Sequence, residues 1–220
     1  EIFYLIGFTT GVKLARNWMF HLQWIKEKEK QYLETELNFL KSQIQPHFFF
    51  NTLNNLYSLT LKKSDQAPEV VLKLSDLMSY MLYESGSGRV ALDKEIAYLH
   101  NYIEVEKLRF GHRLDVVFET TGNTENVFIP PMVLILFIEN SFKHGARNQL
   151  RDGWIHIDIE VQNGCITLKV ENSKPNFHDD DGKASGIGLS NVKKRLVHLY
   201  PNRHSLQLFD ETETHMAILR

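Results

Sequence analysis

The chain contains very little cysteine, and this scarcity excludes two kinds of site. Cys165 is the single cysteine among 220 residues, so the chain can form neither an internal disulfide nor a CxxC pair. Ten histidines are present, but no two of them stand in an HxxxH or HExxH arrangement. The sequence therefore favours a reducing compartment such as the cytosol and gives little support to a site for a metal ion.

The chain also lacks a basic excess and a long apolar run. Its formal net charge is −2 and Lys and Arg do not cluster, so we expect no nucleic-acid partner. The apolar stretch 1–11 is about half as long as a bilayer crossing requires. Two interpretations of this stretch stay open. It starts an amphipathic helix, or it ends a membrane span whose cytoplasmic flank is the basic stretch 13–18.

Helical periodicity dominates the first half of the chain. Residues 18–61 have the pattern of one long helix, which Pro46 interrupts. A coiled-coil-like seam runs along it at Leu33, Leu37, Leu40 and Ile44. After a polar connection at 62–68, a second helix over 70–82 has one broad apolar face. Two antiparallel helices cannot close a core alone, so we expect this long helical hairpin to dimerise into a four-helix bundle.

The second half predicts an α+β architecture. A third helix is expected from Asp93, a candidate N-cap, to Phe110. A helix that opens with two prolines is expected over 130–146. Alternating apolar residues predict strands at 114–120, 154–161 and 165–172, with an Asn-Gly turn between the last two, and a final hairpin over 206–220. We therefore expect a two-layer sandwich with helices on one face of a mixed, mostly antiparallel sheet.

Polar residues that can carry chemistry gather in the stretch "IENSFKH" (138–144). On a helix, Glu139, Asn140, Lys143 and His144 would share one polar arc. An acid and an amide on such an arc can hold Mg²⁺ through oxygen atoms while Lys143 faces a phosphate. The alternative is the solvated end of an amphipathic helix, and the stretch by itself favours that alternative.

Two further stretches are compatible with a phosphate ligand. Gly186 and Gly188 precede a helix whose first amides would be free to bind phosphate, although a lone GxG also occurs at ordinary helix starts. The polar stretch 178–186 has the composition of a lid or of an ordinary loop. Asn172 ends a predicted strand, where asparagine is common.

The order of these motifs resembles the ATP-binding domain that histidine kinases share with Hsp90-type chaperones and gyrases. Together with "LKSQIQPHFFFNTLNNL" upstream, the chain resembles the LytS-like bacterial sensor histidine kinases over about residues 35–201. The resemblance implies a two-component kinase that uses ATP and Mg²⁺, acts as a homodimer and passes a phosphoryl group to an aspartate of a response regulator. It further implies that the full-length protein is inserted in the bacterial inner membrane, with this part at the cytoplasmic face.

The resemblance also implies roles for single residues. His47 is the phosphoacceptor, and the amide of Asn51, one turn later, is placed to orient its ring. Phe48, Phe49 and Phe50 are expected to pack in the dimer bundle and against the ATP-binding domain. On the ATP side, the implied residues are Glu139 and Asn140 for catalysis and Mg²⁺, with Asn140 the better Mg²⁺ ligand, Lys143 and His144 near the phosphates, and Gly186, Gly188 and Asn191 around them.

The implied domains are a signalling helix or membrane-span stub (1–30), dimerisation and phosphotransfer helices (31–110) and an ATP-binding domain (111–220). One position departs from the family pattern, because Asn172 replaces the adenine-reading aspartate and Ser173 and Lys174 follow it in place of glycines. An amide oxygen still accepts a hydrogen bond, but it lacks the charge. Two hypotheses therefore stay open, an active kinase and a dimeric signalling scaffold with an eroded nucleotide site; the motif set favours the kinase.

Overall fold

A computed structural model describes residues 11, 13–14, 16–29, 46–84, 86–145, 153–174, 193, 196–197 and 199–220. The chain divides into two compact units, Glu1–Pro46 and His47–Arg220. In the first unit the described residues between 11 and 29 are helical, and the predicted leucine seam at 33–44 lies outside the described residues. Within the described part of the chain, no helix combines the length and the apolar character that a bilayer crossing requires.

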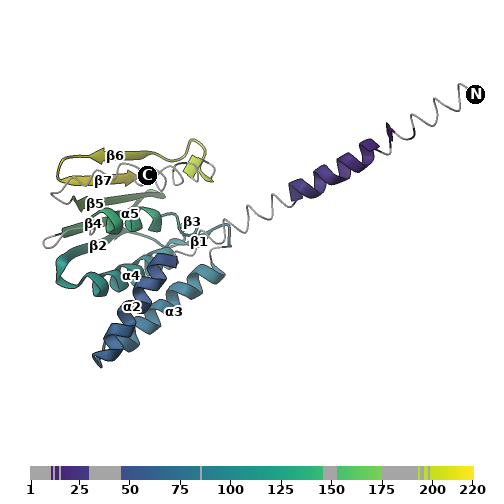
Figure 1. Ribbon diagram of the computed structural model, residues 1–220. Coiled ribbons are helices and arrows are strands. Elements are labelled where there is room, and N and C mark those ends of the chain that lie inside the picture. Colours follow the sequence, from purple (N-terminus) through teal and green to yellow (C-terminus); the bar gives the residue numbers. More distant parts are fainter. Residues whose placement is uncertain are drawn as a thin grey trace, which may run out of the picture. The chain divides into compact units, whose positions relative to one another are not determined.

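Three helices open the second unit (Figure 1). α2 (Pro46–Leu61) and α3 (Ala67–Tyr83) are the two arms of the predicted hairpin, and α4 (Leu92–Phe110) packs against α3. α4 begins one residue before Asp93, and its N-cap is Ala91 rather than the predicted aspartate. Asp93 instead places its carboxylate in the first turn, where it complements the helix dipole. Gly111 ends α4 with a φ of 59°, which glycine adopts without strain.

The sheet is mixed and mostly antiparallel, as predicted. Its spatial order is β2–β4–β5–β7–β6, in which β2 and β4 are parallel and the other neighbours are antiparallel. The strands are β2 (Leu114–Gly122), β4 (Gly153–Gln162), β5 (Cys165–Ser173), β6 (Leu206–Asp210) and β7 (Thr214–Leu219). Asn163 and Gly164 form the predicted turn between β4 and β5, both with positive φ. A short pair, β1 (Val90–Ala91) with β3 (Phe128–Ile129), and the 3-10 turn η1 (Gly111–Arg113) complete these elements.

α5 (Ile135–Gly145) covers β4 and β5 (Figure 1). It starts later than predicted, because Pro130 and Pro131 lie in the turn ahead of it and Met132 has a left-handed φ of 59°. Side chains alternate along β4, with buried residues toward the helices and more exposed ones on the opposite face. The fold is therefore α+β, with helices on one face of the sheet.

One hydrophobic core joins the helices and the sheet of the second unit. Leu77 of α3, Leu99 and Ile103 of α4, Ile138 of α5 and Ile157 of β4 are all at most 1% exposed. This core is what fixes α5, and hence its polar arc, on the sheet. The predicted segment boundaries at 30 and 110 stay predictions.

Candidate functional site

His47 is exposed at the start of α2, and Asn51 lies one helical turn after it. The Asn51 side-chain nitrogen Nδ2 lies 3.2 Å from Nδ1 and 3.2 Å from Nε2 of His47. Asn51 Nδ2 is a donor only, so it can donate only to a ring nitrogen that carries no proton. The Asn51 amide therefore lies within hydrogen-bond distance of the ring, and its role in orienting the ring stays a prediction.

Phe48, the next residue, is the anchor of this helix. Its side chain is 6% exposed and its ring stacks on Tyr102 of α4, with the ring centroids 4.8 Å apart. Phe50 is 67% exposed. Adjacent positions of α2 therefore point in different directions, Phe48 into the core and His47 and Phe50 into solvent. The packing of the phenylalanines in a dimer bundle stays a prediction.

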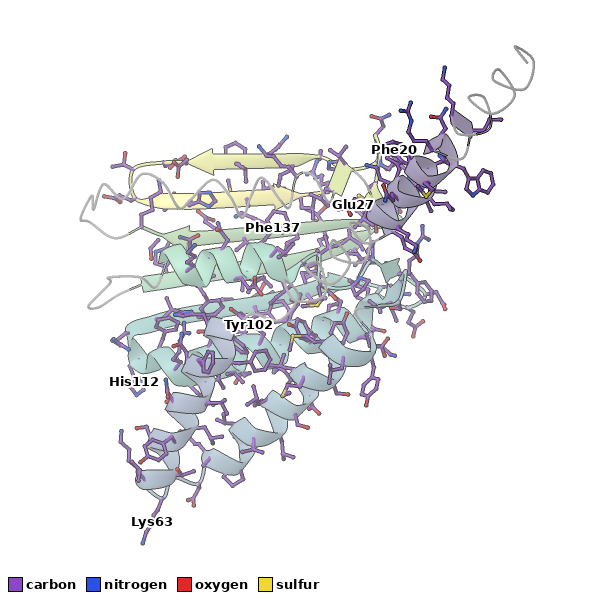
Figure 2. The ribbon with its side chains drawn as sticks, turned by 45° about the vertical axis from the view of Figure 1, so that its right-hand side comes forward. Phe20, Glu27, Lys63, Tyr102, His112 and Phe137 are labelled. Atoms are coloured by element: carbon purple, nitrogen blue, oxygen red, sulfur yellow. The ribbon has the colours of Figure 1, made fainter. Side chains whose placement is uncertain are left out.

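Aromatic rings continue this contact from α2 to α5. Tyr102 meets Phe142 of α5 edge-on at 5.8 Å, and Phe142 stacks on Phe110 at 6.2 Å. The Arg109 guanidinium covers the ring of Phe110 at 4.3 Å. Figure 2 places Tyr102 where α4 meets α2. The helix that carries His47 is therefore joined through α4 to the helix that carries Glu139 and Asn140.

α5 has the predicted polar arc. Glu139 and Asn140 are half-buried and Lys143 is exposed, whereas Ile138 and Phe142 are buried on the other side. Burial raises the pKa of Tyr98 and Tyr102 of α4, and the negative charge of nearby Glu139 raises both pKa values further. The side chain of His144 lies outside the described residues, as do Gly186, Gly188 and Asn191.

Asn172 lies at the far end of β5, against the C-terminal end of α5. A Cβ atom at Gly145 would lie 3.0 Å from the Asn172 Cβ, so a larger residue at position 145 would have to displace the Asn172 side chain. Asn172 is 1% exposed and its Nδ2 donates to the carbonyl oxygen of Ser173 at 3.0 Å. A carbonyl can only accept, and this fixes the side-chain amide with its oxygen turned away from Ser173. The oxygen is thus the atom that can act as an acceptor for a ligand.

Three ionisable residues that were not predicted as ligand-binding residues, Lys174, His215 and Asp210, lie at the strand ends near Asn172. His215 of β7 pairs with Asn172 across the sheet, so the two side chains share a face. Burial lowers the pKa of His215, although Asp210 opposes this. Lys174 Nζ lies 2.6 Å from Asp210 Oδ1, and its hydrogen bond holds the pKa of that carboxyl below its usual range. The strand ends next to Asn172 are therefore polar and partly charged.

Part of the chain matches a known protein family, and most of it is similar to known sensor proteins. Residues 35–114, which include His47, Asn51 and α4, match the histidine kinase family. The sensor protein LytS of Staphylococcus haemolyticus (strain JCSC1435) is 29% identical over 191 residues, which cover 82% of this chain and 32% of that protein. The sensor histidine kinase BtsS of Escherichia coli (strain K12) is 28% identical over 193 residues, covering 87% of this chain and 34% of BtsS. The chain is therefore similar to LytS-like sensor histidine kinases, and its residues 35–114 match the histidine kinase family.

The chain spans about a third of the length of these LytS-like relatives. Among solved structures, the catalytic domain of the histidine kinase ThkA aligns with 60% of this chain and 91% of that domain, at 18% identity and a TM-score of 0.44.

Two buried carboxylates, Glu95 and Glu106, were not predicted from the sequence. Glu95 is 0% exposed and accepts hydrogen bonds from the Tyr80 hydroxyl and, at 3.0 Å, from the Met132 backbone N–H. Glu106 is 2% exposed and lies 2.6 Å from the Arg109 guanidinium. A signal was present, because both glutamates fall on the buried face of α4, in helical spacing with Leu99.

We expect the burial of Glu106 to make stability depend on pH. Burial raises its pKa from 4.5 to about 7, and Arg109 opposes the rise. Between these pH values the folded state holds a proton that the unfolded state has released, so stability falls as pH increases, by at most roughly 3 kcal/mol. Urea unfolding at pH 5 and pH 8 measures this slope. Glu106→Gln should flatten it, whereas Glu104→Gln should not; an unchanged slope in Glu106→Gln would contradict the assignment.

Proposed function

We propose that this chain is the kinase portion of a two-component sensor, which phosphorylates His47 from MgATP and passes the phosphoryl group to an aspartate of a response regulator. The observation that carries the proposal is the exposed His47 with its Asn51 contact, inside the range that matches the histidine kinase family. The polar arc of α5 and the acceptor oxygen of Asn172 support a nucleotide site on the same unit.

The chemistry requires little of the protein beyond positioning. A ring nitrogen of His47 without a proton attacks the γ-phosphorus, the bond from that phosphorus to the β–γ bridging oxygen breaks, and ADP leaves with the electron pair. The proton on the other ring nitrogen is then released to a base. In the second reaction an aspartate oxygen attacks the same phosphorus and the phosphorus–nitrogen bond breaks. Asn51 orients the imidazole ring before the reaction, and because its Nδ2 donates to the nitrogen that attacks, this hydrogen bond must break as the γ-phosphoryl group approaches.

The residues present fit an ATP site at one end of α5. The Asn172 oxygen can accept a hydrogen bond from the amino group of adenine, so the exchange of aspartate for asparagine retains one acceptor oxygen, loses the charge and adds an N–H donor. Lys143, exposed on α5, is available to a phosphate. Among the described residues no three His, Cys, Asp or Glu side chains gather into a metal cage. Mg²⁺ requires no such cage, because phosphates, water and one or two protein oxygens suffice; Asn140 and Glu139 would supply these and the ion would neutralise phosphate charge.

The test is incubation of the purified chain with MgATP labelled at the γ-phosphate, in parallel with titration of a fluorescent ATP analogue. The proposal expects covalent label that is labile in acid and stable in alkali, the stability of a phosphohistidine. Nucleotide binding without label would indicate a kinase that needs a further input signal before it phosphorylates His47. Absence of both binding and label would overturn the proposal and favour a dimeric signalling scaffold.

Dimerisation is part of the proposal, with a second copy of this chain as the partner of the helical hairpin. Four apolar residues spaced three or four positions apart on α2 are between 49% and 67% exposed: Phe50, Leu53, Tyr57 and Leu61. Leu72 and Leu82 of α3 are 68% and 65% exposed. A helix face of this kind needs an apolar partner, and two hairpins together make a four-helix bundle.

We expect the double substitution Leu53→Lys and Leu61→Lys to convert the dimer to a monomer. Two charges per copy would be buried unpaired in the bundle, which costs several kcal/mol, while neither side chain contributes to the core of the single copy. Light scattering coupled to gel filtration measures the mass, and circular dichroism checks that the fold is kept. His112→Lys, exposed and outside the hairpin (Figure 2), is the control. A wild-type monomer, or a variant that stays dimeric, would contradict this interface.

A further inference from the structure

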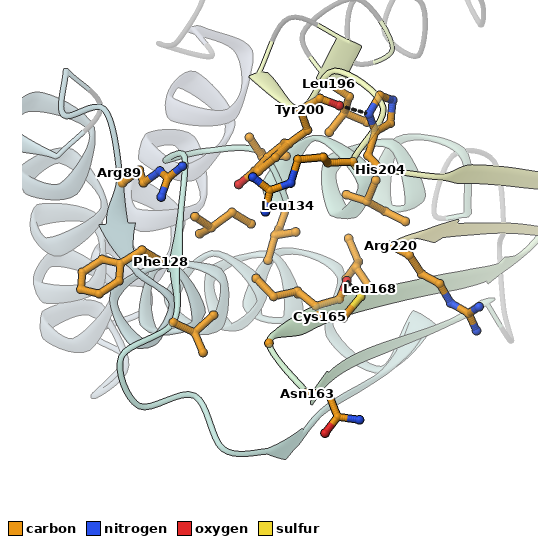
Figure 3. Close-up of a pocket in the computed structure, with 17 residues that line it drawn as sticks. Arg89, Phe128, Leu134, Asn163, Cys165, Leu168, Leu196, Tyr200, His204 and Arg220 are labelled. Carbon is orange, nitrogen blue, oxygen red and sulfur yellow. Dashed lines mark hydrogen bonds between the residues drawn. The ribbon is translucent and has the colours of Figure 1, made fainter.

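A cavity lies at the end of the sheet opposite to Asn172 (Figure 3). Its volume is about 380 Å³, which is in the range of small-molecule pockets. Cys165 and Ile166 at the start of β5 line it, and Asn172 lies near the other end of the same strand. Seven residues of extended strand separate Cys165 from Asn172 by roughly 23 Å. The cavity is therefore separate from the proposed nucleotide site.

The floor of this cavity is apolar. Val133 and Leu134, just before α5, are 1% and 0% exposed, and Leu168 of β5 and Leu196, ahead of Tyr200, are each 1% exposed. These side chains belong to the hydrophobic core, so the floor is rigid and close-packed. The apolar surface that a ligand can reach lies above this layer, on the half-buried Val127 and Ile166 and the exposed Phe128.

The rim of the cavity carries positive charge. Arg89, ahead of β1, and Arg203, ahead of β6, line it and are exposed. Both guanidinium groups act on the phenol of Tyr200, whose pKa they lower against the larger rise from burial. This places both arginines near one point, and Figure 3 shows Arg89 facing the Tyr200 side chain while Arg220 lies on the other side. None of the seventeen described lining residues has an acidic side chain.

An apolar floor below two converging arginines selects a particular chemistry. We propose that this cavity binds an amphipathic organic anion, with its hydrocarbon part on Val127, Phe128 and Ile166 and its carboxylate at Arg89 and Arg203. The planar guanidinium group matches a carboxylate through paired hydrogen bonds. A neutral apolar ligand would leave both arginines without a counter-charge, and a small anion would leave the apolar surface uncovered. The proposal is independent of the kinase activity.

Cys165 gives a direct readout of occupancy. It is the chain's single cysteine, it is exposed, and it lines the cavity. The experiment measures the rate at which a maleimide labels Cys165 in the purified chain, with decanoate added below the concentration at which it forms micelles. We expect decanoate to slow labelling in a saturable way, and decanol and butyrate to have little effect. Because the arginines are exposed, added salt should weaken the decanoate effect.

Two variants and a control make the test specific. Arg89→Gln and Arg203→Gln should each weaken the decanoate effect about ten-fold, since each removes one charge-assisted contact. Arg113→Gln, in η1 and outside the cavity, should leave it unchanged. An unaltered labelling rate without decanoate shows that the variants keep the fold around Cys165. The proposal would be overturned if decanoate gave no protection, or if decanol protected as well as decanoate. It would also be overturned if decanoate protected both arginine variants as well as the wild-type chain. The readout needs no nucleotide, so failure here is distinct from failure of the kinase proposal.

Discussion

His47→Gln is expected to abolish the acid-labile phosphorylation of this chain. Glutamine has no ring nitrogen with a free lone pair, so the proposed nucleophile is lost and no other atom of the side chain can replace it. His47 is exposed and, within the described part of the chain, its side chain contacts Asn51 and makes no buried contact, so the fold should survive. Incubation with γ-labelled MgATP, followed by counting of acid-labile label, gives the result directly.

The matched control is His112→Gln, because His112 is also exposed and lies in η1, away from α2. It should label like the wild type, and both variants should bind a fluorescent ATP analogue with unchanged affinity. Label that persists in His47→Gln would show that another residue accepts the phosphoryl group, even if nucleotide binding is normal.

Asn51 allows a finer test of the same geometry. As a positioning residue it touches the ring and not the phosphate, so Asn51→Ala should slow labelling without weakening ATP binding. Asn51→Asp keeps the size and an acceptor but loses the donor, so it should resemble Asn51→Ala. Equal rates in all three proteins would show that the contact has no part in transfer.

Local patterns predicted the elements of the second unit well. The Asn163–Gly164 turn, the alternation in β4 and the polar arc of α5 all depend on residues a few positions apart, and the structure has them. The errors are at helix starts. Pro130 and Pro131 suggested an early first turn, but Met132 with a positive φ separates them from α5, and no local rule predicts that conformation.

Contacts between distant residues were beyond the sequence. Phe48 and Tyr102 are 54 positions apart, and nothing in either helix alone specifies that their rings stack. The register that places His215 beside Asn172 is likewise a property of the folded sheet. Periodicity identifies which face of an element is buried, whereas the partner of that face depends on how the whole unit packs.

Glu95→Ala is expected to destabilise the second unit by about 3 to 5 kcal/mol, because it leaves the Tyr80 hydroxyl and the Met132 N–H without their acceptor in a buried place. Met132 already has a strained left-handed backbone, which the bond from its N–H helps to hold. Glu95 therefore ties α3 and α4 to the turn that starts α5. Urea unfolding followed by circular dichroism measures the loss.

Two further variants separate the acceptor from its charge. Tyr80→Phe removes one donor and should cost about 1 to 2 kcal/mol. Glu95→Gln keeps a carbonyl oxygen that can accept from both donors, so it should be far milder than Glu95→Ala; His100→Ala, at an exposed position of α4 outside the hairpin, controls for truncation on a helix surface. If Glu95→Gln were as damaging as Glu95→Ala, the negative charge and not the acceptor geometry would hold this junction. If Glu95→Ala unfolded like His100→Ala, core packing around Leu134 and Ile138 would be what fixes the start of α5, and the carboxylate would contribute nothing.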